Sequence, residues 1–142
     1  MIKLKEKYGL IFCSLNFEID GTKIKLENVL IDTGAAKTII NSDFIEIDGT
    51  EEITHAFGVG GRETILDKKV STLKIDNLIL NNLIINAGEM DYGIKIDCIL
   101  GLDILKALNA NISIKDMITK SDNTRYIFNS IFVKRILDIS SE

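Results

Sequence analysis

A single aspartate stands at the centre of the stretch of sequence best suited to chemistry. Asp32 directly follows the apolar run Val29-Leu30-Ile31 and precedes Thr33-Gly34-Ala35. The apolar run predicts a buried strand, and burying an ionised carboxylate is costly unless it is paired or hydrogen-bonded. Gly34 allows the backbone to turn sharply and to approach a second chain or a ligand closely. The stretch therefore predicts a carboxylate delivered to a tight turn, either as a reactive acid or as a structural turn residue.

Two later stretches combine glycine with apolar residues. Phe57-Gly58-Val59-Gly60-Gly61-Arg62 has glycine at three of four successive positions, which favours a mobile hairpin tip, although an ordinary hairpin turn also uses glycine. The position where a dinucleotide-binding loop needs its last glycine is occupied by Glu63. Ile99-Leu100-Gly101 ends a further apolar run, directly before a helix predicted from Leu102 to Leu108.

Taken in order, these three stretches resemble the retropepsin-like aspartic protease family. Asp32-Thr33-Gly34-Ala35 is similar to the family's active-site loop, and Cys98 to Leu105 is similar to its apolar-apolar-glycine element with a short helix. The glycine-rich hairpin lies between them, as the family's flap does. The resemblance extends over roughly Leu10 to Ile114. It implies one domain over residues 1–142, folded as a closed all-β barrel with one short helix near the C-terminal third.

The resemblance also implies roles for individual residues. Asp32 is the expected catalytic residue, and the expected active-site loop consists of Thr33, Gly34 and Ala35. The expected substrate-binding flap consists of Phe57, Gly58, Val59, Gly60 and Gly61. Structural support beneath the loop is expected from Ile99, Leu100 and Gly101. The family implies no cofactor and no metal.

Peptide hydrolysis in this family needs two carboxylates that share one proton, a general property of aspartic-protease dyads. Only one Asp-Thr-Gly occurs in this chain. The resemblance therefore implies a homodimer in which each subunit contributes Asp32, acting on a peptide or protein substrate. The N-terminal segment and a strand predicted from Arg125 to Leu137 are the candidate dimer edges. Viral members carry Arg-Asn where this chain has Leu102-Asp103, which argues against the viral style of dimer contact.

A second class of function stays open beside the enzyme. The same fold could serve as a catalytically silent dimerisation or peptide-binding module, because a fold alone does not fix a function. The Asp-Thr-Gly sequence favours the peptidase. The predicted flap has no Tyr or Trp between Phe57 and Arg62, which weakens the case for the peptidase.

The elements expected to position these residues are mostly short strands. Clean alternation from Leu10 to Asp20, followed by Asp20-Gly21, predicts a hairpin. A helical turn through Ile45, capped by Asn41 or Ser42, is also expected. A turn is expected at Lys120 to Asn123. Further strands are predicted at 22–26, 29–31, 38–40, 53–57, 64–66, 70–75, 78–80, 83–87, 94–100 and 109–114. Many short strands separated by turns predict an all-β fold.

Composition limits the classes of partner and site. The net charge of −4 and the absence of a basic stripe argue against a nucleic-acid partner, and no apolar run approaches the ~20 residues of a membrane span. No secretory signal pattern precedes the first strand, so a cytoplasmic location is expected. Free, buried thiols are expected at Cys13 and Cys98, and His55 is expected to be an ordinary strand residue.

Overall fold

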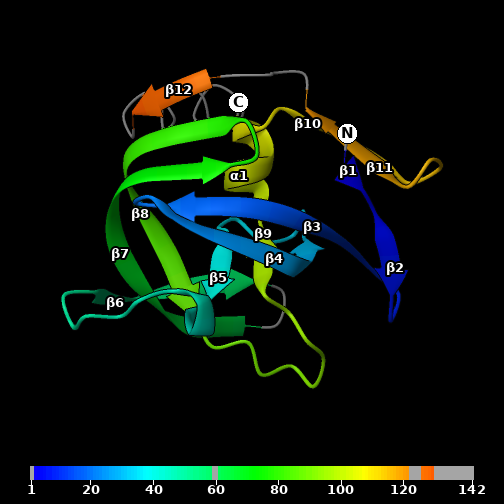
Figure 1. Cartoon of the computed structure of the whole chain (residues 1–142). Helices are drawn as coiled ribbons and strands as arrows, with labels where there is room; N and C mark the ends of the chain where they lie inside the picture. Colours follow the sequence, from blue (N-terminus) through cyan, green and yellow to red (C-terminus); the bar gives the residue numbers. More distant parts are fainter. Residues whose placement is uncertain (1, 59–60, 122–125, 130–142) are drawn as a thin grey trace.

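The structure is a computed structural model that describes residues 2–58, 61–121 and 126–129. Most of this part of the chain is β-strand, with one α-helix and one 3₁₀ turn (Figure 1). The elements are β1 (Ile2–Lys3), β2 (Lys5–Lys7), β3 (Leu10–Ile19), β4 (Thr22–Ile31), β5 (Ile39–Asn41), η1 (Ser42–Phe44), β6 (Glu52–Gly58), β7 (Gly61–Ile75), β8 (Leu78–Gly88), β9 (Cys98–Leu100), α1 (Leu102–Ala107), β10 (Ala110–Ser113), β11 (Ile118–Ser121) and β12 (Tyr126–Asn129). No helix among the described residues is long and apolar enough to cross a membrane.

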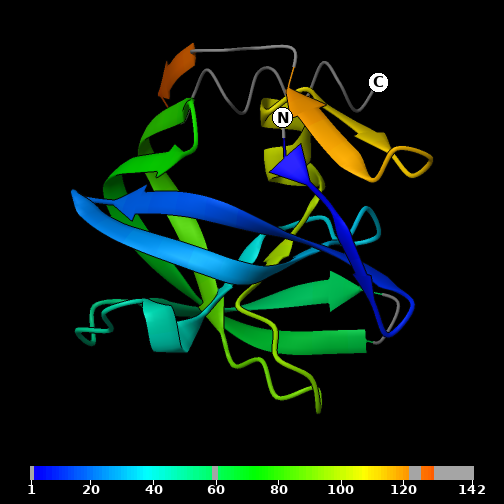
Figure 2. The ribbon, with the colours of Figure 1, turned by 45° about the vertical axis from the view of Figure 1, so that its right-hand side comes forward.

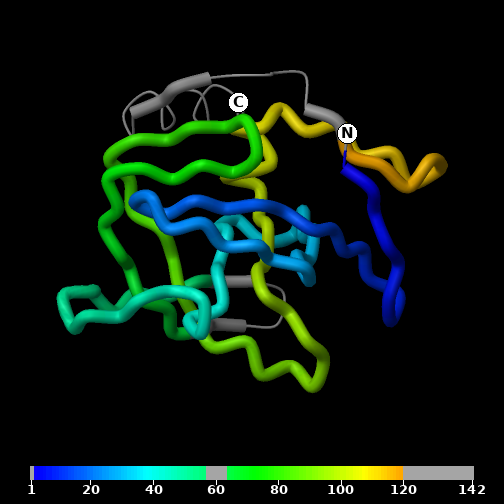
Figure 3. The backbone as a smooth tube through the Cα atoms, viewed as in Figure 1, coloured from blue at the N-terminus to red at the C-terminus, as the bar shows by residue number. Residues whose placement is uncertain are grey.

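A nine-stranded sheet forms most of the described structure. Its order is β12-β8-β5-β9-β4-β3-β7-β6, with β2 added beside β3 and a further pairing between β7 and β8. Figure 3 follows the backbone through this sheet, in which most neighbouring strands are not consecutive in sequence. The prediction of an all-β fold with one short helix is confirmed, and the closed barrel stays a prediction.

The β3–β4 hairpin forms where alternation and the Asp-Gly signal predict it. Asp20 and Gly21 have positive φ values of 47° and 85°, the combination that a two-residue hairpin turn requires. Leu15, Phe17 and Ile19 point into the core and are buried. The Asp20 carboxylate accepts hydrogen bonds from the backbone N–H groups at Ser71 (2.8 Å) and Thr72 (2.9 Å), which fastens the hairpin tip to β7.

A small second sheet lies beside the helix. It has the order β1-β11-β10, and Figure 2 shows it next to α1. Leu4, between β1 and β2, is buried in the main core, and the half-buried Ile2 and Ile112 pack against that core. This second sheet therefore ties the N-terminal residues to the segment after the helix, through the antiparallel pairing of β1 with β11.

Several predicted boundaries change because hydrogen bonds override local propensity. Of the turn predicted at Lys120 to Asn123, Lys120 and Ser121 belong to β11 instead, and positions 122 and 123 lie outside the described residues. The chain turns at 114–117. There the Ser113 hydroxyl accepts from the Asp116 N–H (3.2 Å), and Met117 takes a φ of 53°. The strand predicted at 94–100 is limited to β9.

Other predicted strands merge into longer ones. The strands predicted at 64–66 and 70–75 are parts of β7, and those predicted at 78–80 and 83–87 are parts of β8. The predicted capped turn after Asn41 is confirmed as η1, where the Asn41 side chain accepts from the Asp43 N–H. Of the strand predicted from Arg125 to Leu137, residues 126–129 form β12, and the other positions lie outside the described residues.

Candidate active site

Asp32 stands where β4 ends beside the short parallel strand β9. Leu30 lies opposite Ile99 and Ile31 opposite Leu100 in this pairing. The Asp32 N–H then donates to the Leu100 carbonyl at 3.0 Å, which continues the ladder by one bond beyond the strand. The buried residues that lead to Asp32 fix the end of β4, so the position of this half-buried carboxylate is set by the core.

The residues after Asp32 form a tight turn closed by Asp32 itself. Its Oδ1 accepts the Gly34 N–H at 2.9 Å, and its carbonyl accepts the Ala35 N–H at 3.2 Å. Such turns are a common use of aspartate. Among the described residues, Gly34 N–H is the one hydrogen-bond donor recorded on this carboxylate. Thr33 and Gly34 are exposed, so the turn presents its outer side away from the protein core.

Gly101 holds the turn from beneath. A Cβ atom at this position would lie 2.6 Å from the Lys37 carbonyl oxygen and 2.8 Å from that of Ala35, well inside normal contact distance. The Leu102 N–H donates to the Ala35 carbonyl at 2.8 Å. The start of α1 is therefore in direct backbone contact with the loop after Asp32, and only glycine fits at the point of closest approach.

The residues predicted to support the loop lie next to it. Leu100 is buried beneath the Asp32 turn, and Ile99 packs on a small apolar cluster that contains Phe12, Leu30 and Ile96. The structure thus brings residues 32–35 together with residues 99–101, although they are more than sixty positions apart in sequence.

A partly buried hydrogen-bond network between Thr38 and Asp103 was not predicted. The Asp103 carboxylate accepts from the Thr38 hydroxyl (2.7 Å), the Thr38 N–H (3.1 Å) and the Ile104 N–H (2.7 Å). The Thr38 hydroxyl in turn accepts the Gly101 N–H at 2.9 Å. No periodicity relates Thr38 to Asp103, so nothing local in the sequence identifies the pair.

Asp97 forms a second network that sequence reasoning missed. This carboxylate is only 3% exposed, and its Oδ2 accepts from the backbone N–H groups of Glu27 (3.1 Å) and Asn28 (2.9 Å) and from the Asn28 side-chain amide (3.2 Å). The network holds β4 where the β3–β4 pairing shifts register, between Cys13 and Leu15. A signal was present: an acid between Ile96 and Cys98 needs buried partners for the same reason as Asp32.

The predicted flap forms the outermost hairpin of the sheet. Phe57 pairs with Arg62 and Gly58 with Gly61, and the tip residues Val59 and Gly60 lie outside the described residues. Figures 1 and 2 show this β6–β7 hairpin extending on the same side of the molecule as the loop after β4. The structure joins this hairpin to the site through β7 and β8, since Leu66 pairs with Ala87 and Ile40 of β5 also pairs with Ala87.

The two cysteine thiols, in β3 and β9, are buried and free, as predicted. Cys13 and Cys98 each pair with Val29, from opposite sides of β4. Burial, assisted by the charge of Asp76, raises the pKa of Cys13 to about 12. Burial, with a smaller contribution from Cys13, raises the pKa of Cys98 well above its usual value. Both thiols therefore stay protonated at neutral pH and act as small apolar core residues.

Comparison with known proteins identifies the family. The family model described as aspartyl protease matches residues 15–104, more than half of the 142 residues, and this range includes Asp32 and Ile99 to Asp103. A comparison with curated proteins gives no match. No group of three or more His, Cys, Asp or Glu side chains in the described ranges is arranged to hold a metal ion. With its Asp-Thr-Gly turn at the end of β4 and this family match, the chain belongs to the aspartyl protease family.

Proposed function

We infer that this protein is an aspartic endopeptidase that works as a homodimer. The observation that carries this proposal is the presentation of Asp32: a half-buried carboxylate at the end of a buried strand, on a turn braced by Gly101 and otherwise exposed. A structural turn acid would not need an exposed turn held so firmly from beneath. The family match supports hydrolysis of peptide bonds as the reaction.

The need for a second carboxylate supports a dimer. Two carboxylates that lie close together cannot both ionise, and in aspartic proteases generally the pair titrates as one unit. The chain has one Asp-Thr-Gly, and Thr33 and Gly34 are exposed in the single chain. A two-fold axis beside this turn would cover both residues and would place one Asp32 against the other.

In the proposed mechanism, one Asp32 carboxylate acts as the base that activates a water molecule. The other, protonated, donates a hydrogen bond to the carbonyl of the scissile peptide bond. The Gly34 N–H fixes Oδ1 of each Asp32 and leaves Oδ2 for the shared proton. The water attacks the carbonyl carbon and gives a proton to the first carboxylate, while the second carboxyl gives its proton to the carbonyl oxygen. As the C–N bond breaks, the first carboxyl passes its proton to the leaving nitrogen, and the second takes one back from the resulting acid.

The β6–β7 hairpin would hold the substrate over the two carboxylates. Main-chain hydrogen bonds of a hairpin can bind an extended peptide as an added strand. In this proposal residues 57–61 form that flap, on a closed β barrel whose pairings run from β8 through β5, β9, β4, β3 and β7.

Replacement of Asp32 by asparagine tests the catalytic assignment. Cleavage of a diverse peptide pool, followed by mass spectrometry at several pH values, should fall by at least ~1000-fold in Asp32→Asn, because the acid–base group is lost. The fold should persist, since asparagine can still accept the Gly34 N–H. The matched control is Asp43→Asn, which changes an exposed aspartate in η1 and should leave cleavage unchanged.

Dilution tests the shared site. Specific activity should fall as the dimer dissociates, with sedimentation velocity measured on the same samples. A monomer that retains full specific activity would contradict the two-subunit site. Dimerisation and peptide binding without any cleavage, in wild type at every pH tested, would identify a silent binding module instead.

A further inference from the structure

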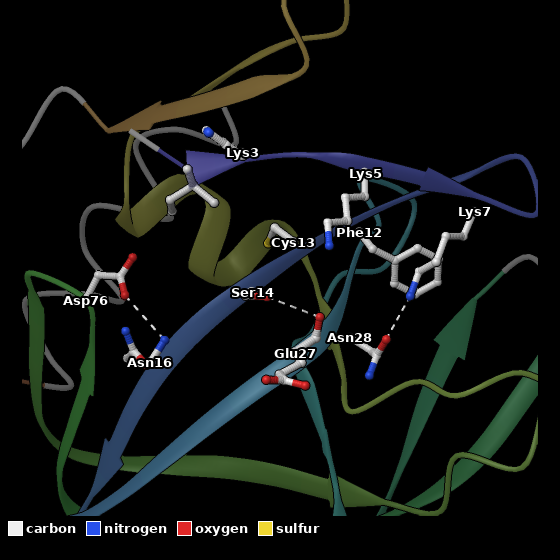
Figure 4. A pocket seen from close by; sticks show the side chains of 11 residues that line it. Lys3, Lys5, Lys7, Phe12, Cys13, Ser14, Asn16, Glu27, Asn28 and Asp76 are labelled. Atoms are coloured by element: carbon white, nitrogen blue, oxygen red, sulfur yellow. Dashed lines mark hydrogen bonds between the residues drawn. The ribbon is translucent and has the colours of Figure 1, made fainter.

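A pocket lies under the N-terminal arm, which we define as residues 2–7. Its volume is about 560 Å³, within the range of small-ligand and peptide sites. None of the residues Asp32 to Ala35 lines it. It is formed where the arm crosses β3 and the adjoining part of β4, and Figure 4 shows the side chains that line it: Ile2, Lys3, Lys5, Lys7, Phe12, Cys13, Ser14, Asn16, Glu27, Asn28 and Asp76.

The arm lines this pocket with three lysines. Alternate residues of an extended chain point to the same side, roughly 6–7 Å apart. Lys3, Lys5 and Lys7 accordingly line the pocket, whereas Leu4 is buried in the core. In a chain with a net charge of −4, this is a local concentration of positive charge.

None of these ammonium groups has a carboxylate partner among the described residues. Lys7 Nζ donates to the Asn28 side-chain oxygen at 2.7 Å and lies 4.6 Å from the centre of the Phe12 ring, which fixes its head group without neutralising it. Figure 4 shows Lys5 and Lys7 reaching from the arm toward β3 and β4. Lys3 and Lys5 are exposed and form no recorded ion pair. The pocket therefore carries three ammonium groups against the carboxylates of Glu27 and Asp76, an excess of one positive charge.

The two acidic residues of the pocket each have a contact of their own, although both keep their negative charge. Glu27 lies 3.9 Å from the ammonium group of Lys25, and the Asp76 carboxylate accepts the Asn16 N–H at 3.3 Å. The floor of the pocket includes Cys13 and Ser14 of β3, where no strand pairs on this side because pairing with β2 ends at Phe12 and pairing with β7 begins at Phe17. The Asn16 N–H donates to the Asp76 carboxylate and the Asn16 carbonyl accepts the Asp76 N–H at 3.0 Å, so the open edge is limited to the stretch before Asn16. A short open strand edge can pair with part of an extended peptide backbone.

We propose that this pocket is an accessory site for an acidic, extended segment of the peptide or protein substrate. Carboxylates at alternate positions of such a segment match the spacing of the arm lysines, and its main chain passes the short open edge of β3 at Cys13 and Ser14. The proposal rests on the proposed peptidase function, and it selects substrates that carry an acidic stretch outside the bond to be cleaved.

Peptide binding tests the site independently of catalysis. The probe is a fluorescent peptide in which glutamate alternates with serine, titrated with the full-length Asp32→Asn protein and followed by anisotropy. Lys3→Gln/Lys5→Gln should weaken binding about three- to tenfold, the effect of two exposed charge contacts. Lys23→Gln/Lys115→Gln removes the same charge from exposed positions that do not line the pocket, and should leave binding unchanged.

Three outcomes would overturn the accessory site. They are no binding of the acidic peptide, equal weakening in both double variants, and displacement by inorganic phosphate at constant ionic strength as efficient as by unlabelled peptide.

A cleavable substrate with and without the acidic extension then separates the two proposals. The extension should lower KM and leave kcat unchanged. Acidic-peptide binding by a protein that cleaves nothing would retain the accessory site and reject the peptidase, whereas cleavage with a KM unaffected by the extension would do the reverse.

Discussion

The loop after β4 (residues 32–38) and the N-terminal arm (residues 2–7) are both attached to the β3–β4–β9 part of the sheet, but by opposite means. The loop is held by partly buried hydrogen bonds from Thr38 to Asp103 and by backbone contact with Gly101 and Leu102. The arm is held by strand pairing of β1 and β2 and by one buried side chain, Leu4. Its lysines line the pocket beneath it.

The difference separates positioning from recognition. A carboxylate that takes part in chemistry must be held within a fraction of an ångström, and a buried network with every group satisfied provides this rigidity. A site that selects a charged segment needs long side chains that adapt to it, at a smaller energy per contact. We therefore expect substitutions around the loop to cost stability, and substitutions on the arm to alter binding with little effect on folding.

The largest effect is expected from Gly101→Ala. The added methyl group must displace the Lys37 or Ala35 carbonyl, so the variant should lose about 3 kcal/mol of unfolding free energy, the upper part of the range for overpacking. Urea denaturation measures the loss. The control is Gly21→Ala, which has open space around the new atom and only the cost of its positive φ, about 1 kcal/mol. A smaller loss in Gly101→Ala than in Gly21→Ala would show that the contact beneath the loop is not tight.

The next effect concerns the Thr38–Asp103 network. Thr38→Val leaves the Gly101 N–H without its acceptor, and Asp103→Ala leaves the Thr38 N–H and hydroxyl without theirs, so each should cost about 2 kcal/mol. In the double variant the losses should overlap, with a coupling of at least ~1 kcal/mol by denaturation. Additive losses would mean that the two residues brace the loop independently.

The same network should be visible in catalysis. If Thr38 and Asp103 position Asp32, Thr38→Ser keeps the hydroxyl and should retain most of the activity of wild type. Thr38→Val should lower kcat with little change in KM. A change in KM alone would assign the network to substrate binding.

The two thiols allow the loop and the arm to be compared by pH. Cys13 lines the arm pocket and Cys98 lies in β9 beneath the loop. Because the folded pKa of Cys13, about 12, exceeds the ordinary value of 9.0, the unfolded state loses this proton first as pH rises. Stability should therefore fall above pH 9.0, by up to about 1.4 kcal/mol per pH unit for each thiol. Urea unfolding at pH 8 and pH 10.5 should show a smaller alkaline loss in Cys13→Ala than in wild type. If the alkaline loss of stability in Cys13→Ala equals that in wild type, the Cys13 thiol does not have the raised pKa in the folded state.

Local features of the fold could be predicted from sequence, and distant pairings could not. The β3–β4 hairpin, the Asn41 cap and the helix from Leu102 follow from turn chemistry and periodicity over a few residues. The pairing of β4 with β9 joins positions about 70 residues apart. The Thr38–Asp103 and Asn28–Asp97 contacts depend on that pairing. Asp32 could be identified because its whole turn is contiguous in sequence, whereas the residues that brace it come from elements that only the fold brings together.

The smallest effect is expected from Lys7→Met, which tests whether the arm is as weakly anchored as the comparison implies. Methionine keeps an unbranched apolar side chain against Phe12 and removes the charge and the hydrogen bond to Asn28. The partly buried cation–π contact and this single hydrogen bond should together contribute about 1 kcal/mol. The matched control is Lys23→Met, at an exposed position of β4. Urea denaturation measures the unfolding free energy of both variants. A loss in Lys7→Met as large as that in Gly101→Ala would mean that the arm is anchored as firmly as the loop, and the division between a rigid loop and an adaptable arm would fail.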